Sequence, residues 1–270
     1  MDCCQPRECP TELEEVEMAP GVRVEIADLH KRYGSVRALR GISFSTGNGW
    51  RCLGVLGRNG VGKTTLLRVL VGLLQADHGR IEVEVDGTAW SHAGPRIAAF
   101  VGEQTTVVPT ITGWQYFRLH ADMNRLLGIG VNAGVRDEMV QHFLLAEHLG
   151  KPAGKMSKGN RRKTEVVAAL ASEVPLLVAD ELTDGLDVPS RMALEQVLQE
   201  AAKYEKHFIV SSHDLSFVRS VCDTVAVIDG GRCVDWFAMS ADEPSFRSRV
   251  ARAFELVAAD SPPVPDAASA

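Results

Sequence analysis

Residues 57–65 of the chain read Gly-Arg-Asn-Gly-Val-Gly-Lys-Thr-Thr, and their types and spacing suit the binding of a nucleoside triphosphate. Glycines at 57, 60 and 62 allow a tight curl in which successive backbone N–H groups point inward at a phosphate. Lys63 is placed to reach the β- and γ-phosphates, and the Thr64 hydroxyl is placed to ligate Mg²⁺. The nucleotide-binding residues predicted in this loop are Gly57, Arg58, Asn59, Gly60, Val61, Gly62, Lys63, Thr64 and Thr65.

A second apolar run, residues 176–179, ends in the acidic pair Asp180 and Glu181. A buried strand beside the phosphate loop would deliver Asp180 to the coordination shell of Mg²⁺, usually through a water molecule. Glu181, one residue further, would face the γ-phosphate, where its carboxylate can orient and polarise the attacking water. The alternative is an acid pair that only ends a strand. The presence of the phosphate loop favours the catalytic interpretation.

Two further polar residues follow predicted strands. His213 comes after the apolar run 208–211 and is in reach of the γ-phosphate if the strands are neighbours, although a lone histidine is more often structural. Gln104 follows the run 98–102, and its side-chain amide is placed to contact Mg²⁺ or the attacking water. The sequence therefore predicts Glu181 and His213 as catalytic residues, and Thr64, Gln104 and Asp180 as metal ligands.

The positioning elements follow from the pattern of apolar residues. Strand-like runs lie at 22–26, 51–56, 81–85, 98–102, 176–179, 208–211, 224–228 and 232–236, and helix-like stretches begin after Lys63 and near Val188 and Leu215. Such alternation predicts an α/β domain with a mostly parallel sheet. Three helix-like stretches at 114–127, 135–147 and 158–171 follow one another without a strand, which predicts a helical insertion at about 105–171.

The composition indicates the class of protein and the kind of partner. Hydrophobic residues make up 45% and charged residues 24% of the chain, as in an ordinary soluble globular protein. The net charge of -6 disfavours nucleic acid as the main partner, because binding to its phosphates normally requires a basic surface. No apolar stretch is long enough to span a bilayer, and the first residues do not resemble a signal peptide. We expect a cytoplasmic protein.

The two ends of the chain differ in composition from the rest. We expect a flexible leader over residues 1–20, a domain over 21–240, a C-terminal helix within 241–259 and a disordered tail over 260–270. Cys3, Cys4 and Cys9 cluster in the leader, where a metal site or lipid attachment finds weaker support than a flexible segment.

Taken in order over residues 22–236, these motifs resemble the ATP-binding subunit of an ABC transporter. Tyr33 matches the aromatic residue that stacks on adenine in this family, and the turn Gly185-Leu186-Asp187 matches a further family element. The corresponding family motifs are also matched by the phosphate loop, Gln104, the acid pair and His213. The resemblance implies a P-loop NTPase (ABC ATPase) core with a mostly parallel sheet, N-terminal antiparallel strands and a helical subdomain insertion.

The segment Met156-Ser157-Lys158-Gly159-Asn160 sits where the family has its signature, usually Leu-Ser-Gly-Gly-Gln. Ser157 suits the N-cap of a helix running to about residue 171, which leaves the N–H groups of Lys158 and Gly159 as a second anion site. In the family this site closes on the γ-phosphate held by a partner subunit. The resemblance thus implies ATP contacts from Ser157 and Gly159 across a homo- or heterodimer.

Three residues depart from the family pattern: Lys158 replaces a glycine, Asn160 replaces a glutamine, and Leu182 replaces the proline after the catalytic glutamate. None of the three removes a group that the chemistry needs. Ser-Lys-Gly followed by the basic residues 161–163 resembles the branch that serves export-type permeases. The alternative for the basic residues is a solvated helix face.

The resemblance implies a subunit that binds and hydrolyses ATP with Mg²⁺ and powers a separate membrane permease at the inner face of the cell membrane. The permease would grip the helical insertion near Gln104, notably at 110–117. One alternative is a soluble ABC ATPase that acts in assembly or regulation without a permease. Another, a nucleotide-binding regulator without turnover, is disfavoured because Glu181 and His213 are both present.

Overall fold

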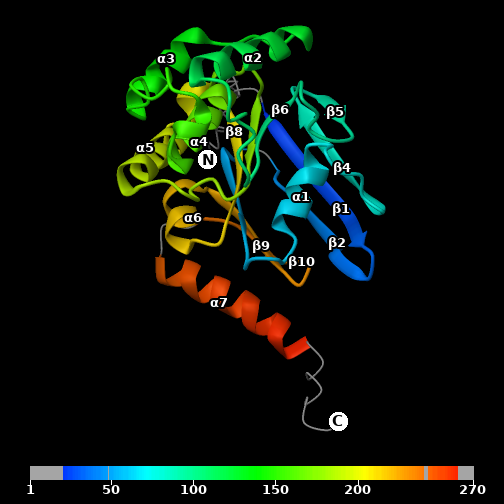
Figure 1. Cartoon of the computed structure of the whole chain (residues 1–270). Coiled ribbons are helices and arrows are strands. Elements are labelled where there is room, and N and C mark those ends of the chain that lie inside the picture. Colours follow the sequence, from blue (N-terminus) through cyan, green and yellow to red (C-terminus); the bar gives the residue numbers. More distant parts are fainter. Residues whose placement is uncertain (1–20, 48, 240–242, 261–270) are drawn as a thin grey trace, which may run out of the picture.

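The computed structural model describes residues 21–47, 49–239 and 243–260. The expected leader over residues 1–20, with its three cysteines, and nearly all of the expected tail at 260–270 lie outside the described residues. The described chain forms two sheets with helices packed around them (Figure 1).

The larger sheet has six strands in the order β10-β9-β3-β8-β7-β6. These strands are β3 (Cys52–Leu56), β6 (Ala98–Val101), β7 (Leu176–Ala179), β8 (His207–Ser212), β9 (Thr224–Asp229) and β10 (Arg232–Ala238). The strands from β9 to β6 pair in parallel, and the edge strand β10 runs antiparallel to β9. The expected α/β fold with a mostly parallel sheet is confirmed.

Side chains of β3 alternate between two apolar cores. Leu53 and Val55 share a core with helix α1 (Lys63–Leu70) and the smaller sheet, whereas Cys52 and Leu56 share one with helices α5 (Val188–Gln199) and α6 (Leu215–Val221). Successive strand residues point to opposite faces, so a strand covered on both faces must be apolar throughout. The phosphate loop therefore leaves a strand that is packed on both sides and firmly held.

The smaller sheet is antiparallel, with the order β2-β1-β4-β5. Its strands are β1 (Val22–Tyr33), β2 (Val36–Ser45), β4 (His78–Val85) and β5 (Thr88–Trp90). The N-terminal antiparallel strands are thus confirmed, but the apolar pattern had indicated only the first part of β1 and had missed β2 and β5. In β2 buried residues are interspersed with more exposed ones and with Arg37 and Arg40, and β5 has only three residues, all exposed, so neither strand contains a continuous apolar run.

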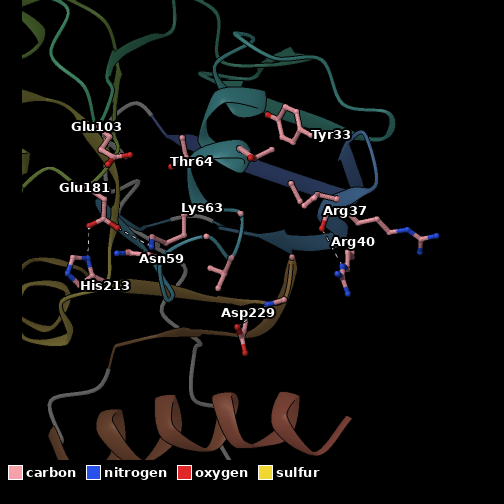
Figure 2. Close-up of a pocket in the computed structure, with 18 of the residues that line it drawn as sticks. Tyr33, Arg37, Arg40, Asn59, Lys63, Thr64, Glu103, Glu181, His213 and Asp229 are labelled. Carbon is pink, nitrogen blue, oxygen red and sulfur yellow. Dashed lines mark hydrogen bonds and ion pairs between the residues drawn. The ribbon is translucent and has the colours of Figure 1, made fainter. Parts of the chain in front are cut away.

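A tight turn joins β1 to β2 and fixes Tyr33 at the end of its strand. Gly34 adopts a positive φ of 58°, and Tyr33 pairs with Val36 across the turn. The Tyr33 side chain is exposed on the side of the sheet that faces the phosphate loop (Figure 2).

Helices α2 (Gly113–Leu126), α3 (Ala133–His142) and α4 (Lys158–Ala171), with the short 3-10 turn η1 (Ala153–Lys155), separate β6 from β7. Figure 1 places α2 and α3 at the end of the molecule opposite α7 (Glu243–Asp260). The helix predicted over 135–147 ends at His142, because Leu144 has a positive φ of 51° that a helix cannot continue through. The break lets Leu145 and Leu149 turn inward and become fully buried.

The C-terminal helix α7 packs on the β9–β10 side of the larger sheet. Its buried residues Phe246, Val250 and Ala253 lie one helical turn apart, which is the spacing of an apolar stripe. The helix begins and ends close to the predicted bounds. A second 3-10 turn, η2 (Ala201–Tyr204), precedes β8. Within the described residues, no helix combines the length and the apolar character needed to cross a membrane.

Candidate nucleotide-binding site

The phosphate loop between β3 and α1 is packed so closely that side chains are excluded at two of its glycines. A Cβ atom on Gly57 would lie 2.4 Å from the carbonyl oxygen of Ile228 on β9. A Cβ atom on Gly62 would lie 2.5 Å from the carbonyl oxygen of Ala38 on β2, and Gly62 also has a φ of 112°. Real side chains do not fit at either position. The loop is therefore held between the two sheets, with the start of α1 aimed at the space above it.

A cavity of about 710 Å³ lies above the loop. Both sheets contribute to its walls, as Figure 2 shows: Tyr33, Arg37 and Arg40 come from the smaller sheet, and Glu181 and His213 from the larger one. The lining residues are Tyr33, Val36, Arg37, Ala38, Arg40, Asn59, Gly60, Val61, Gly62, Lys63, Thr64, Thr65, Glu103, Glu181, Asp184, His213, Asp229, Gly230 and Gly231. Basic side chains, loop N–H groups and an aromatic ring in one cavity are the groups that a nucleoside triphosphate requires.

Lys63, Glu181 and His213 form one connected cluster at the floor of the cavity. The Nζ atom of Lys63 lies 3.0 Å from Oε1 of Glu181, and Nδ1 of His213 lies 3.0 Å from Oε2 of the same carboxylate. Lys63 also donates hydrogen bonds to the carbonyl oxygens of Gly57, at 2.8 Å, and Arg58, at 3.1 Å. With 5% of its side chain exposed, Lys63 is a nearly buried cation whose anionic partner is Glu181.

Asp180 and Thr64 supply oxygen atoms that fit Mg²⁺. Asp180 is buried beside Glu181, and its Oδ1 accepts a hydrogen bond of 2.5 Å from the Ser211 hydroxyl. Its Oδ2 is buried and has no hydrogen-bond partner among the described residues. A buried carboxylate oxygen is costly to leave unpaired, and carboxylate and hydroxyl oxygens are ligands that Mg²⁺ prefers. The donor set is thus compatible with the metal.

Gln104 takes a different place from the other predicted site residues. It is exposed and does not line the cavity, whereas its neighbour Glu103 does. Strand β6 ends at Val101, and in the segment that follows it Glu103 points into the cavity (Figure 2). Gly57, Arg58 and Asp180 also do not line the cavity.

The predicted second anion site lies in a separate cavity of about 370 Å³. Its lining residues are Ser157, Lys158, Gly159, Asn160, Lys163, Gly185, Asp187 and Ser190. Ser157 is the N-cap of α4, as predicted, and its hydroxyl accepts a hydrogen bond of 3.1 Å from the N–H of Asn160. Ser157 and Gly159 are therefore apart from the P-loop cavity of their own chain.

A salt bridge that the sequence did not indicate connects the two cavities. The Nζ atom of Lys158 lies 2.6 Å from Oδ2 of Asp184, and this hydrogen bond lowers the pKa of the Asp184 carboxyl. Lys158 lines the second cavity and Asp184 lines the first. The pair also explains how a lysine is tolerated in the first turn of α4, where a cation opposes the helix dipole. A family pattern with glycine at this position gives no signal for it.

The sequence analysis did not predict the arginines that lie at the site. Arg37 and Arg40 line the P-loop cavity, but nothing in the pattern of β2 marks them. Arg162 is buried, which corrects the alternative of a solvated face for the basic residues 161–163.

The fold and the cavity together define a P-loop nucleotide-binding domain of the α/β class, with a helical insertion between strands β6 and β7. The chain belongs to the ABC transporter family, because the sequence profile described as "ABC transporter" matches residues 39–184, more than half of the chain. As a member of this family it is an ATP-binding ATPase domain.

Individual relatives agree with this assignment. The chain is 29% identical over 237 residues to the ABC transporter ATP-binding protein NatA of Bacillus subtilis, which covers 83% of this chain and 93% of NatA. It is 30% identical over 226 residues to the methionine import ATP-binding protein MetN of Rhizobium etli, covering 78% of this chain and 60% of MetN. A solved ATP-binding subunit of an ABC transporter superimposes with a TM-score of 0.69 at 22% identity, covering 84% of this chain and 99% of that one.

Proposed function

We propose that the chain is the ATP-hydrolysing subunit of an ABC transporter, that it dimerises around two ATP molecules, and that it powers a separate membrane permease in export. The observation that carries the proposal is the cluster of Lys63, Glu181 and His213 on the floor of a glycine-loop cavity. The cluster puts a phosphate-binding cation and a water-orienting carboxylate in direct contact.

Nucleotide binding uses the loop and the smaller sheet. The exposed ring of Tyr33 stacks on adenine, and the N–H groups of residues 59–65 surround the phosphates. Thr64 and Asp180 are the residues that would hold Mg²⁺, which neutralises phosphate charge when bound. Gln104 joins this set only if the segment after β6 rearranges, because Gln104 is exposed and does not line the cavity.

The salt bridge between Lys63 and Glu181 makes binding and catalysis dependent on each other. The γ-phosphate is an anion that competes with Glu181 for the Lys63 ammonium. Once Lys63 turns to phosphate, Glu181 is freed to orient the attacking water and accept its proton. His213 contacts the same carboxylate and lines the cavity, so it steadies both Glu181 and the phosphate edge.

Dimerisation supplies the remaining anion site. The free N–H groups at the start of α4 lie beside Ser157 and Gly159 in a cavity without a P-loop of its own. A γ-phosphate held by a partner subunit satisfies these donors, so two chains close head to tail around two nucleotides. Hydrolysis removes the shared phosphate and lets the pair separate.

The permease contact and the direction of transport are proposed from the sequence. The helical insertion near residues 110–117 is the expected contact, which would hold the chain at the cytoplasmic face of the membrane. Export is proposed from the Ser-Lys-Gly signature and the basic residues after it. MetN, a relative named for import, carries the same kind of domain. The rival function is a soluble ABC ATPase in assembly or regulation, without a permease.

Fractionation of the native cells separates these two functions. A transport subunit is expected in the membrane fraction, retained through a high-salt wash, released by alkaline carbonate, and co-purified in detergent with one polytopic membrane protein. A chain found in the supernatant under the same low-salt lysis would contradict the permease and favour the soluble ATPase.

A further inference from the structure

The Arg162 side chain lies buried beneath the catalytic turn, with 3% of the residue exposed. Its Nη2 donates hydrogen bonds to the carbonyl oxygens of Asp180, at 2.7 Å, and Glu181, at 2.9 Å. Its Nη1 donates to the carbonyl oxygen of Gly102. One guanidinium therefore connects the segments that follow β6 and β7. Two of its three acceptors are the carbonyl groups on either side of the Glu181 Cα atom.

The backbone that Arg162 holds is a strained one. Glu181 has a φ of 46°, in the left-handed region that residues with a Cβ atom rarely adopt. A second side chain holds the other side of this residue, because the N–H of Glu181 donates to the Ser211 hydroxyl at 2.9 Å. Both backbone polar groups of Glu181 are thus bound by side chains from other elements. Such a conformation persists only where its surroundings impose it.

Burying the Arg162 guanidinium costs desolvation free energy, which an apolar side chain at this position would not cost. Its nearest carboxylate is Glu165 on the same helix, at 4.0 Å, and Glu165 is itself buried and accepts hydrogen bonds from Thr106. Burial lowers the pKa of Arg162, and the carboxylates of Glu165 and Asp180 oppose that shift. Arginine is the side chain whose planar fork can serve several carbonyl oxygens at once, and a lysine or glutamine cannot reproduce it.

We propose that Arg162 is a positioning residue that holds Glu181 in its left-handed conformation, so that the Glu181 carboxylate reaches Lys63 and His213. The inference rests on the proposed catalytic role of Glu181. It also gives the signature helix a direct connection to catalysis, because Arg162 lies one and a half turns after Ser157 on α4.

The test compares steady-state ATP hydrolysis and nucleotide affinity in Arg162→Gln, Glu181→Gln and the double variant. Arg162→Gln is expected to bind ATP within about threefold of the wild type and to lower kcat by about 10- to 100-fold, the effect of losing hydrogen bonds to a charged group. Because Arg162 acts through Glu181, the double variant should be no slower than Glu181→Gln alone. Arg162→Lys, which keeps the charge but not the fork, should recover only part of kcat.

Arg249→Gln is the control for the loss of an arginine with several hydrogen bonds, since Arg249 binds Asp235 and the carbonyl oxygen of Trp236, and none of these residues lines the cavity. The Arg249→Gln variant should leave kcat unchanged.

A kcat within about twofold of the wild type in Arg162→Gln would overturn the proposal. The proposal would also be overturned if the losses of kcat in the two single variants multiply in the double variant, because multiplied losses mean that the two residues act independently. If Arg162→Gln does not fold, Arg162→Lys carries the test: unchanged kcat overturns the proposal, and lowered kcat with unchanged ATP affinity supports it. Unchanged turnover in Glu181→Gln would instead defeat the proposed function.

Discussion

Replacing Lys63 with alanine is expected to weaken ATP binding by about 100-fold, because the variant loses charge-assisted hydrogen bonds to the phosphates. The same change removes the hydrogen bonds that Lys63 donates to the carbonyl oxygens of Gly57 and Arg58. It also leaves Glu181, which is mostly buried, without its cation. Titration of the purified chain with ATP and Mg²⁺ measures the affinity.

Lys203→Ala is the matched control for this loss of a lysine. Lys203 forms a salt bridge of 2.6 Å with Glu138 on the surface, away from the cavity, so its removal should leave ATP affinity unchanged. An unchanged affinity in Lys63→Ala, with the control behaving as expected, would remove the phosphate-binding role from residues 57–65.

Replacing Glu181 with glutamine is expected to lower ATP turnover by about 10²- to 10⁴-fold, as is typical for the loss of a positioned base. The variant should bind ATP at least as tightly as the wild type. The reason is that Lys63 forms a salt bridge with the Glu181 carboxylate, and a neutral amide competes less with phosphate for that cation. Turnover and affinity are measured on the same preparation.

The comparison variant is Glu138→Gln, which makes the same change in an exposed salt bridge. It should keep wild-type turnover. Near-normal turnover in Glu181→Gln would show that another group orients the water. Weaker ATP binding in that variant would contradict the competition between Glu181 and the γ-phosphate for Lys63.

The features that could be predicted from the sequence are those that depend on neighbouring residues. The glycine spacing of the phosphate loop, the acid pair at the end of an apolar strand and the Ser157 N-cap are each written within a few positions. Strands of the larger sheet were equally visible, because burial on both faces requires continuous apolar runs.

The features that escaped prediction depend on contacts between distant segments. Strand β2 contains exposed residues and two arginines, so its pairing with β1 rather than its composition makes it a strand. The placement of Glu103 in the cavity depends on where β6 ends. The apolar run extends to residue 102, whereas the strand ends at Val101, and the run itself does not indicate this difference. The sequence around Arg162 is that of a charged helix face, and its hydrogen bonds to the chain after β6 and β7 depend on how α4 packs against those strands.

The most direct test of the proposed paired site is the specific ATPase activity of the purified chain measured over a wide range of protein concentration. If Ser157 and Gly159 of one chain complete the site of another, specific activity should rise with concentration and then level off, and Glu181→Gln should stay inactive throughout. Specific activity that is independent of concentration, in a chain that remains monomeric with ATP bound, would contradict the account.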